Sequence, residues 1–450
     1  MNRLPKSAAR SAAGETGGAE NGGSSVPESL RIVQSAIAPR SPECIFTGRM
    51  DAKQKKLLGA VSVFHVFNDA SVVTLPTIFP LLYTQGYLIK RYADIGALML
   101  VGLAVSILFH FFVGHWAKGR HYRPLLFLGV LTVGLFLWLT PYARSFGMLL
   151  LFYVGVRIGS SIYHPVGVSW VTHSFGGRLF DRAMGIQSAF GDVGVLAAFL
   201  GTGYLAQHYG WSVPLHVWGA LCAAGAFAGL VLSRGTNGAD DAGDESEAVS
   251  WRETILDQRR LVVPAVVGGV AWGINMAYAP SLLNHRLGAP ISLTGIILGG
   301  WIAAGVAASL TYSRIAARIG RHGVIALGFS ATAVSTLLIG LSTNLALTAA
   351  LIAIFGYALL LTFPALLTLV GASAKSKNRT AAFSLIANLQ IVGNAVFVFV
   401  SGFMSDAWGI HTPFLMLGAL STFVAFYAAA LRKRERRIAP APPLVEGIRP

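Results

Sequence analysis

Long apolar stretches dominate this chain and restrict it to one class of architecture. No Glu occurs between Glu43 and Glu245, and only 12% of the 450 residues are charged, whereas 54% are hydrophobic. Soluble proteins carry about 25% charged residues, so a soluble fold is excluded. Backbone groups inside a bilayer must be hydrogen-bonded within the protein, and a helix of about 20 apolar residues achieves this. The sequence therefore predicts an all-α, polytopic membrane protein.

Twelve segments have the length and apolar character of a spanning helix. They lie at 57–83, 95–115, 125–142, 147–170, 183–206, 214–233, 261–284, 291–313, 324–341, 345–371, 381–405 and 410–431. This spacing predicts two six-helix halves, at 57–233 and 261–431, joined by a cytoplasmic linker at 234–260.

Two tails flank these halves. Residues 1–56 are largely rich in Gly, Ser, Ala and Pro, and we expect a disordered tail there. Met50 stands directly before the first span, which makes it a candidate native start. Residues 432–450 form a basic tail at the other end.

The net charge of +16 follows the predicted topology. Thirty of the 35 Lys and Arg residues lie in the tails and in the loops on one side of the membrane. The loops on the other side hold only Lys90, Arg91, Arg144 and Arg286. Because cytoplasmic loops are rich in Lys and Arg, we expect both termini in the cytoplasm. The basic residues occur in short bursts between spans, so we expect no nucleic-acid partner.

The two halves show an internal repeat at a constant offset of 199 residues. Gly203, Gly210 and Pro214 align with Gly402, Gly409 and Pro413. A basic stretch also follows the second span of each half. Parallel repeats of six helices are typical of the major facilitator architecture.

Several stretches of the first half resemble the fosmidomycin-resistance branch of the major facilitator superfamily. They are Phe64-His-Val-Phe-Asn-Asp69, Phe79-Pro-Leu-Leu82, Gly114-His-Trp-Ala117, Gly159-Ser-Ser-Ile-Tyr-His-Pro165, Gly176-Gly-Arg178 and Gln187-Ser188. The resemblance implies a monomeric bacterial inner-membrane exporter, driven by protons, for a small anionic or drug-like compound. It also implies that the first and fourth spans line a central cavity.

The same resemblance assigns gating loops on the cytoplasmic side. Their residues are Gly114, Lys118, Arg120, Arg318 and Arg321. Lys118 and Ala317 stand where the superfamily has an acidic residue. The fifth span lacks the proline of drug antiporters.

Ionisable residues inside spans are costly, at about 2.5–3.5 kcal/mol each, and indicate function. Only Asp69, Asp192 and Arg157 are acids or strong bases in mid-span. His65 lies one helical turn before Asp69, so the two side chains can touch. We predict that His65, Asp69 and Asp192 take part in proton coupling. The alternative for His65 and Asp69 is a purely structural tie between helices.

The fourth span carries Arg157, Ser161 and His164 along one helical face, and Pro165 predicts a bend. Arginine binds carboxylates and phosphonates through its planar fork. We therefore predict an anion site on this face. A buried ion pair between Arg157 and Asp192, which should lie at similar depth, is the structural alternative.

The remaining predicted substrate contacts are neutral amides. They are Asn68 in the first half and Asn275, Asn388 and Gln390 in the second.

The sequence therefore predicts a proton-coupled antiporter of small molecules, with no metal and no cofactor. A proton-coupled importer of an organic acid would need the same residues. A membrane-embedded enzyme or a non-transporting sensor is a weaker alternative, because no hydrolase, metalloprotease or phosphate-binding motif is present.

Overall fold

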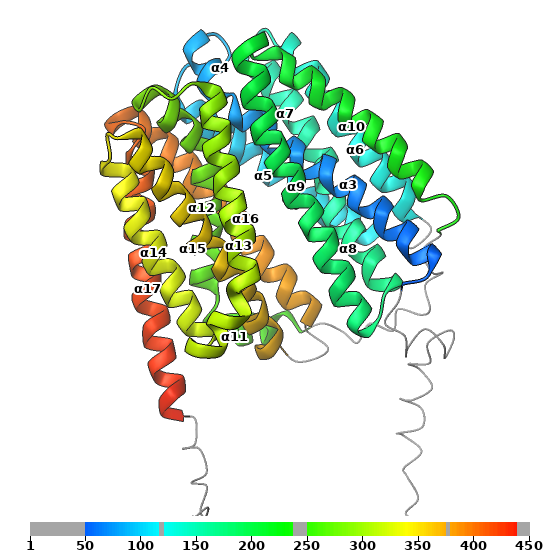
Figure 1. Ribbon diagram of the computed structural model, residues 1–450, viewed down its shortest axis with the longest axis vertical. Coiled ribbons are helices and arrows are strands. Elements are labelled where there is room, and N and C mark those ends of the chain that lie inside the picture. Colours follow the sequence, from blue (N-terminus) through cyan, green and yellow to red (C-terminus); the bar gives the residue numbers. More distant parts are fainter. Residues whose placement is uncertain (1–49, 117–120, 237–249, 375–378, 439–450) are drawn as a thin grey trace, which may run out of the picture. The chain divides into compact units, whose positions relative to one another are not determined.

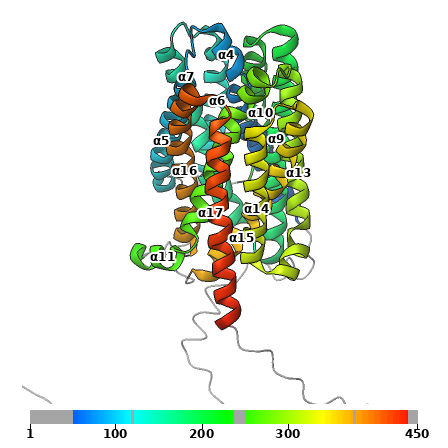
Figure 2. The ribbon, with the colours of Figure 1, turned by 90° about the vertical axis from the view of Figure 1, so that its left-hand side faces the viewer.

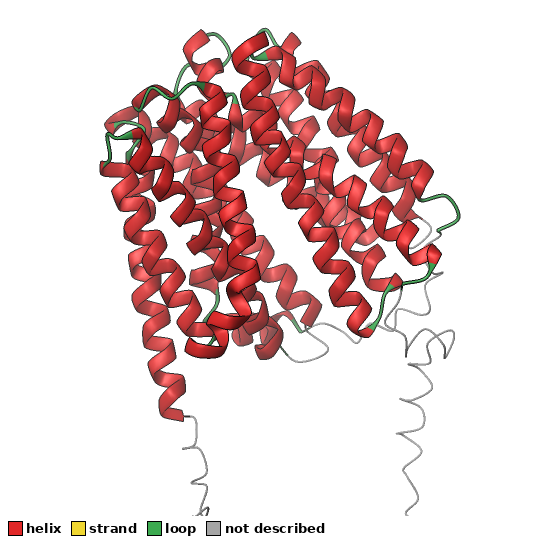
Figure 3. Cartoon of the chain, viewed as in Figure 1, coloured by secondary structure: helices red, strands yellow, loops and turns green. Residues whose placement is uncertain are grey.

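The computed structural model describes residues 50–116, 121–236, 250–374 and 379–438. The described residues are almost entirely helical and contain no strand (Figure 3). Twelve of the helical segments in these ranges are long and apolar enough to cross a membrane. The predicted fold class and the six-plus-six division of spans are confirmed. Residues 1–49 of the predicted disordered tail and residues 237–249 of the linker lie outside the described residues, whereas 52–56, also predicted to be disordered, form the first turn of a helix.

Each span corresponds to one or two helices. The first six comprise α3 (Ala52–Thr77), α4 (Phe79–Gln85), α5 (Tyr92–Trp116), α6 (Tyr122–Leu139), η2 (Thr140–Tyr142), α7 (Phe146–Ser161), α8 (Tyr163–Ser174), α9 (Gly177–Tyr209) and α10 (Ser212–Leu232). A short helix α11 (Trp251–Gln258) precedes the second six, which comprise α12 (Val262–Ser281), η3 (Leu282–Arg286), α13 (Ile291–Ile319), α14 (Arg321–Leu341), α15 (Leu345–Ser373), α16 (Arg379–Trp408) and α17 (Thr412–Ile438). Figure 1 shows the two sets side by side, and Figure 2 shows α17 along α14, with which it is in contact.

Proline explains where the first and fourth spans divide. The break between α7 and α8 falls at Ile162, three residues before Pro165. A proline ring clashes with the carbonyl four residues earlier and removes one hydrogen bond. Similarly, Pro76 and Pro80 flank Ile78, where α3 gives way to α4. The predicted bend in the fourth span is confirmed, and it separates Arg157 on α7 from His164 on α8.

The glycines of the internal repeat lie where the two halves meet. A Cβ atom on Gly203 of α9 would come within 2.8 Å of the carbonyl oxygen of Ile291, at the start of α13. A Cβ atom on the matching Gly402 of α16 would come within 2.7 Å of the Cα of Ala93, on α5. Small residues let helix backbones approach closely. The repeat therefore has a structural meaning, because equivalent glycines serve equivalent interfaces between the halves.

Polar contacts join the halves at the membrane side opposite the chain ends, here called the far side. The carboxylate of Asp406 accepts hydrogen bonds from the backbone nitrogens of Tyr92, at 2.7 Å, and Ala93, at 3.0 Å. These are the first N–H groups of α5, which have no partner within their own helix. The Nε2 atom of His285 on η3 lies 3.0 Å from the carbonyl oxygen of Pro80. Asp406 and His285 of the second half thus bind backbone groups of the first half and join the two halves on the far side.

We predict that Asp406→Ala loosens this junction. Loss of the cap should cost about 1–2 kcal/mol, which corresponds to a roughly 5- to 30-fold shift toward states with the far side open. The measurement is the labelling rate of an Ala93→Cys reporter, 3% exposed in its native form, with a membrane-impermeant maleimide in an otherwise cysteine-free protein.

Asp94→Ala is the matched control for this prediction. Asp94 caps Lys90 and Arg91 within its own half, so its removal also loses a carboxylate cap but leaves the junction between halves intact. Equal labelling rates in the two variants would contradict a role for Asp406 in closing the far side.

Candidate functional site

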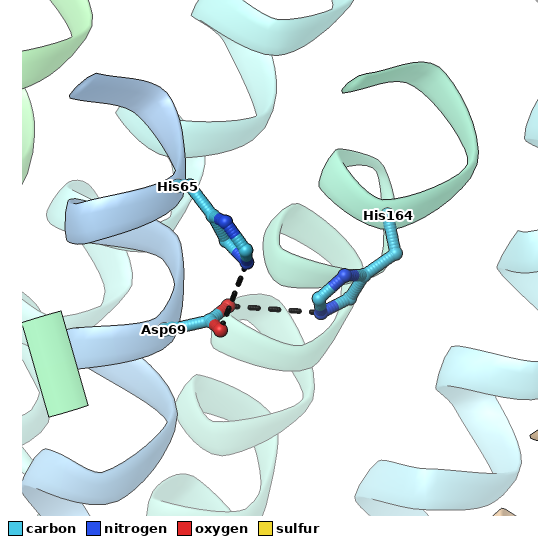
Figure 4. Close-up of side chains that lie close together, drawn as sticks. All are labelled: His65, Asp69 and His164. Atoms are coloured by element: carbon cyan, nitrogen blue, oxygen red, sulfur yellow. Dashed lines mark ion pairs between the residues drawn. The ribbon is translucent and has the colours of Figure 1, made fainter. Parts of the chain in front are cut away.

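Three ionisable side chains from two helices meet within the first half. The Nε2 atom of His65 on α3 lies 3.0 Å from the Oδ2 atom of Asp69, one turn later. The Nε2 atom of His164 on α8 lies 3.6 Å from the other carboxylate oxygen, Oδ1. Figure 4 shows the two imidazoles approaching the carboxylate from opposite helices. The predicted contact between His65 and Asp69 is confirmed, and His164 joins it.

The protonation of His65 follows from its partners. Its Nδ1 atom lies 2.7 Å from the backbone carbonyl oxygen of Gln187. A carbonyl oxygen only accepts hydrogen bonds, so Nδ1 carries a proton. In a neutral ring, Nε2 then presents a lone pair to the carboxylate of Asp69. Two acceptors at 3.0 Å need a proton between them, so the pair holds one proton, shared between Nε2 and Oδ2.

Neighbouring side chains hold this pair in place. The ring of Tyr163 stacks on that of His65, with centroids 4.4 Å apart and planes 18° apart. The side chain of Gln187 donates to the hydroxyl of Tyr163 at 2.8 Å. The amide of Asn68 donates to Oδ1 of Asp69 at 2.8 Å. Asn68 is 1% exposed, so its amide serves the carboxylate and does not face open space.

Tyr163 and Gln187 lie in the stretches that carry the family resemblance, but the sequence alone assigns no role to either residue. Their contacts with His65 depend on how α8 and α9 pack against α3. The sequence signal that could have found them is their polar character inside the apolar fourth and fifth spans, close to His164 and Asp192.

Close packing of α9 on α3 shapes the site. Gly191 lies directly against the pair, since a Cβ atom there would come within 2.6 Å of Cε1 of His65 and 2.9 Å of Oδ2 of Asp69. Gly194, one turn later, packs on the backbone carbonyl of Val66. These two glycines allow α9 to supply the carbonyl of Gln187 to His65. Asp192 lies beside Gly191 and makes no hydrogen bond or ion pair with any described residue.

Arg157 does not pair with Asp192, and that structural alternative is wrong. The Nε atom of Arg157 donates to the hydroxyl of Ser106 on α5 at 3.1 Å. No ion pair joins Arg157 to an acid within the described residues. Its side chain packs on Gly102, where a Cβ atom would come within 2.8 Å of Cγ. Helix α7 turns the side chain of Arg157 toward α5 and not toward α9.

The other predicted substrate contacts differ in their surroundings. Ser161 is buried, and its hydroxyl donates to the carbonyl of Ile158 in its own helix. Asn275 is fully buried, and neither polar atom of its amide has a hydrogen-bond partner among the described residues. Asn388 is half-buried on α16. Gln390 borders a narrow gap between α12, α14 and α15. None of these four side chains contacts the cluster of His65, Asp69 and His164.

The described gating residues, Gly114, Arg318 and Arg321, lie on the same side of the helical bundle as the start of α3 and the end of α17 (Figure 1). Gly114 belongs to the last turns of α5, whereas Lys118 and Arg120 lie outside the described residues. Arg318 and Arg321 are exposed at the junction of α13 and α14. Arg321 borders a groove of about 570 Å³ between the ends of α15 and α16. Their gating role stays a prediction.

The twelve spans, the repeated halves and the polar cluster define a multi-pass membrane protein built as a helical transporter. The sequence pattern of the Major Facilitator Superfamily matches residues 61–286 and, a second time, residues 261–449. The chain belongs to the Major Facilitator Superfamily. It is a member whose substrate is not known.

One curated relative and two solved structures are similar to parts of the chain or to its fold. The fosmidomycin resistance protein of Escherichia coli (strain K12) is 32% identical over 122 residues, which make up 27% of this chain and 30% of that protein. A bacterial homologue of the human lysosomal transporter Spinster, in an inward-facing and unoccupied conformation, superposes with a TM-score of 0.70 and 16% identity over 87% of this chain and 100% of its own. The nucleoside transporter NupG superposes with a TM-score of 0.68 and 14% identity over 84% of this chain and 99% of its own. These two structures share the fold.

We predict that Gly191→Ala disrupts the His65–Asp69 pair. The added methyl group would meet both side chains, and overpacking of this kind costs about 1–3 kcal/mol. The apparent Tm of the purified protein in detergent should fall. Gly185→Ala, two turns earlier on the same helix, is the matched control because a Cβ atom there meets nothing within 4 Å. This control should keep or raise the Tm, since alanine favours helix. A Gly191→Ala protein as stable as the control would contradict the described contact.

Proposed function

We propose that this protein is a proton-coupled antiporter that exports a small anionic or drug-like compound across the bacterial inner membrane by alternating access. The observation that carries the proposal is the 3.0 Å contact between Nε2 of His65 and Oδ2 of Asp69, two atoms that can share one proton. Such a pair can exist with the proton, or without it at a higher free energy, because the two acceptor atoms then repel each other. A transporter needs a group of this kind if the proton gradient is to drive its cycle.

The exposure of His164 supports a path for that proton. Its side chain is 55% exposed, whereas those of His65 and Asp69 are 7% and 22% exposed. An exposed imidazole in mid-span is costly in lipid, so it favours a position that faces water. His164 then connects the buried pair with that water. Asp192 beside Gly191 is a second acid near the pair and a further candidate for proton coupling.

Arg157 supports an anionic substrate. The hydroxyl of Ser106 accepts a hydrogen bond from the Nε atom of Arg157. The two terminal nitrogens of the guanidinium have no hydrogen bond or ion pair within the described ranges. A half-buried guanidinium with two free donors fits a carboxylate or phosphonate.

The direction of transport, the membrane and the topology rest on other observations. Export is supported by the 32% identity with a fosmidomycin resistance protein. The excess of Lys and Arg on the side of both termini supports their cytoplasmic position. Polar contacts that join the halves on the far side support a conformation open to the cytoplasm. We further propose that the protein acts as a monomer.

We predict that expression in a bacterial host lacking its main efflux pumps raises tolerance to fosmidomycin or to another small anionic drug. Arg157→Ala should remove most of that tolerance, because the anion loses its charged partner. Arg144→Ala is the matched control, since Arg144 is exposed at the start of the fourth span. Unchanged tolerance and accumulation for every compound tested would contradict export and favour uptake.

We predict that Asp69→Asn separates proton coupling from substrate exchange. In proteoliposomes loaded with a compound found by the tolerance assay, a proton gradient should drive at least about tenfold less flux in the variant. Substrate counterflow without a gradient should persist, because that step needs no proton transfer. Asp51→Asn is the matched control: it lies at the start of α3 outside the span, and asparagine also caps helices. Equal gradient-driven flux in wild type and Asp69→Asn would remove Asp69 from the coupling mechanism.

A further inference from the structure

The cluster that holds the proton also has the composition and spacing of a metal site. One ligand atom each from His65, Asp69 and His164 lies within 4.8 Å of the other two. Zinc bonds to histidine nitrogen and carboxylate oxygen are about 2.0–2.2 Å long, which places tetrahedral ligand atoms about 3.3–3.5 Å apart. The two histidine nitrogens lie on the same carboxylate at comparable separations, 3.0 Å from His65 to Oδ2 and 3.6 Å from His164 to Oδ1.

The surroundings of His65 match those of a metal ligand. A ligating histidine commonly donates its other ring nitrogen to a backbone carbonyl, which fixes the tautomer. The bond from Nδ1 to the carbonyl of Gln187 does this at 2.7 Å. The Nε2 atom is buried and lies 3.0 Å from Oδ2 of Asp69. Asn68 orients that carboxylate through Oδ1. His65 therefore has the fixed ring orientation of a metal ligand, and its Nε2 faces a carboxylate that a neighbouring amide holds in place.

We propose that His65, Asp69 and His164 bind a divalent cation of the Zn²⁺ class in place of the shared proton. Binding of the cation releases that proton to water, so the site gains one net positive charge. Two nitrogen donors and one carboxylate favour Zn²⁺ or Co²⁺ over Mg²⁺ and Ca²⁺. The exposed ring of His164 provides the entry path, and a fourth position stays open for water.

Other ionisable groups act on this site from neighbouring helices. Asp192 of α9 interacts electrostatically with Asp69 and His65, and Arg157 of α7 and His110 of α5 interact with His164.

A bound cation should also inhibit transport. It occupies the atoms that hold the proton, and a carrier locked in that form cannot exchange protons. This second part rests on the proposed proton coupling, whereas binding itself does not.

The test of binding is a titration of the purified, metal-free, full-length protein in detergent. Zn²⁺ is measured by isothermal titration calorimetry in buffers of different ionisation enthalpy, and Co²⁺ by its visible absorption. We expect one cation per chain at the site and release of about one proton. His164→Gln should weaken binding at least about tenfold, and Asp69→Asn more. His208→Gln, on the exposed end of α9, is the matched control and should bind as wild type does.

Two results would overturn the metal site. One is equal affinity in wild type, His164→Gln and Asp69→Asn, which would assign the binding to other histidines of the chain. The other is that the wild-type protein binds no Zn²⁺ at concentrations up to about 1 mM, so that any dissociation constant would exceed about 1 mM. Each variant is compared only if it keeps a cooperative thermal transition, and His164→Ala replaces His164→Gln if that variant does not.

Flux measurements separate this inference from the proposed function. In proteoliposomes, Zn²⁺ should reduce gradient-driven flux, a chelator should restore it, and His164→Gln should require at least about tenfold more Zn²⁺. If the cation binds but no proton gradient drives flux, the site stands and the proposed function fails. If gradient-driven flux is present and Zn²⁺ neither binds nor inhibits, the metal site alone fails.

Discussion

The contact between Nε2 of His65 and Oδ2 of Asp69 depends on one shared proton, and the first half of the protein is arranged around it. A carboxylate inside a span is costly unless it is paired. Three helices provide for this pairing: α3 carries both residues, α9 fixes the tautomer through the carbonyl of Gln187, and α8 adds His164. Gly191 and Gly194 let α9 approach closely enough to take part. In this region the close packing of α9 on α3 is therefore also what brings the carbonyl of Gln187 to His65.

The two halves share a helical plan but differ in chemistry. The repeat preserves the glycines of the interfaces, so Gly203 and Gly402 serve corresponding contacts. It does not preserve the ionisable residues, since Asp69, Arg157 and Asp192 align with Gly268, Gly356 and Ile391 at the offset of 199 residues. This asymmetry suits a division of labour in which the first half holds the proton and the second half moves against it. The far-side caps from Asp406 and His285 then hold one arrangement of the halves.

Local features of the sequence predicted the spans, the bend before Pro165 and the contact of His65 with Asp69. Each depends only on apolar length, on the ring of proline or on the spacing of one helical turn. The roles of Tyr163 and Gln187 could not be predicted, because they depend on the rotation of α8 and α9 about their axes. The same rotation explains why the Arg157–Asp192 pair was wrong. Topology predicts depth in the membrane, but it does not predict which neighbour a side chain faces.

The bond from Nδ1 of His65 to the carbonyl of Gln187 has a consequence for the movement of protons through the site. A histidine that accepts a proton at one nitrogen and passes it on from the other can act as a wire. Here Nδ1 already carries a proton and is held 2.7 Å from an acceptor that takes none in exchange. A proton that reaches Nε2 can leave only from Nε2. The ring therefore cannot relay a proton from Nε2 to Nδ1 in this arrangement.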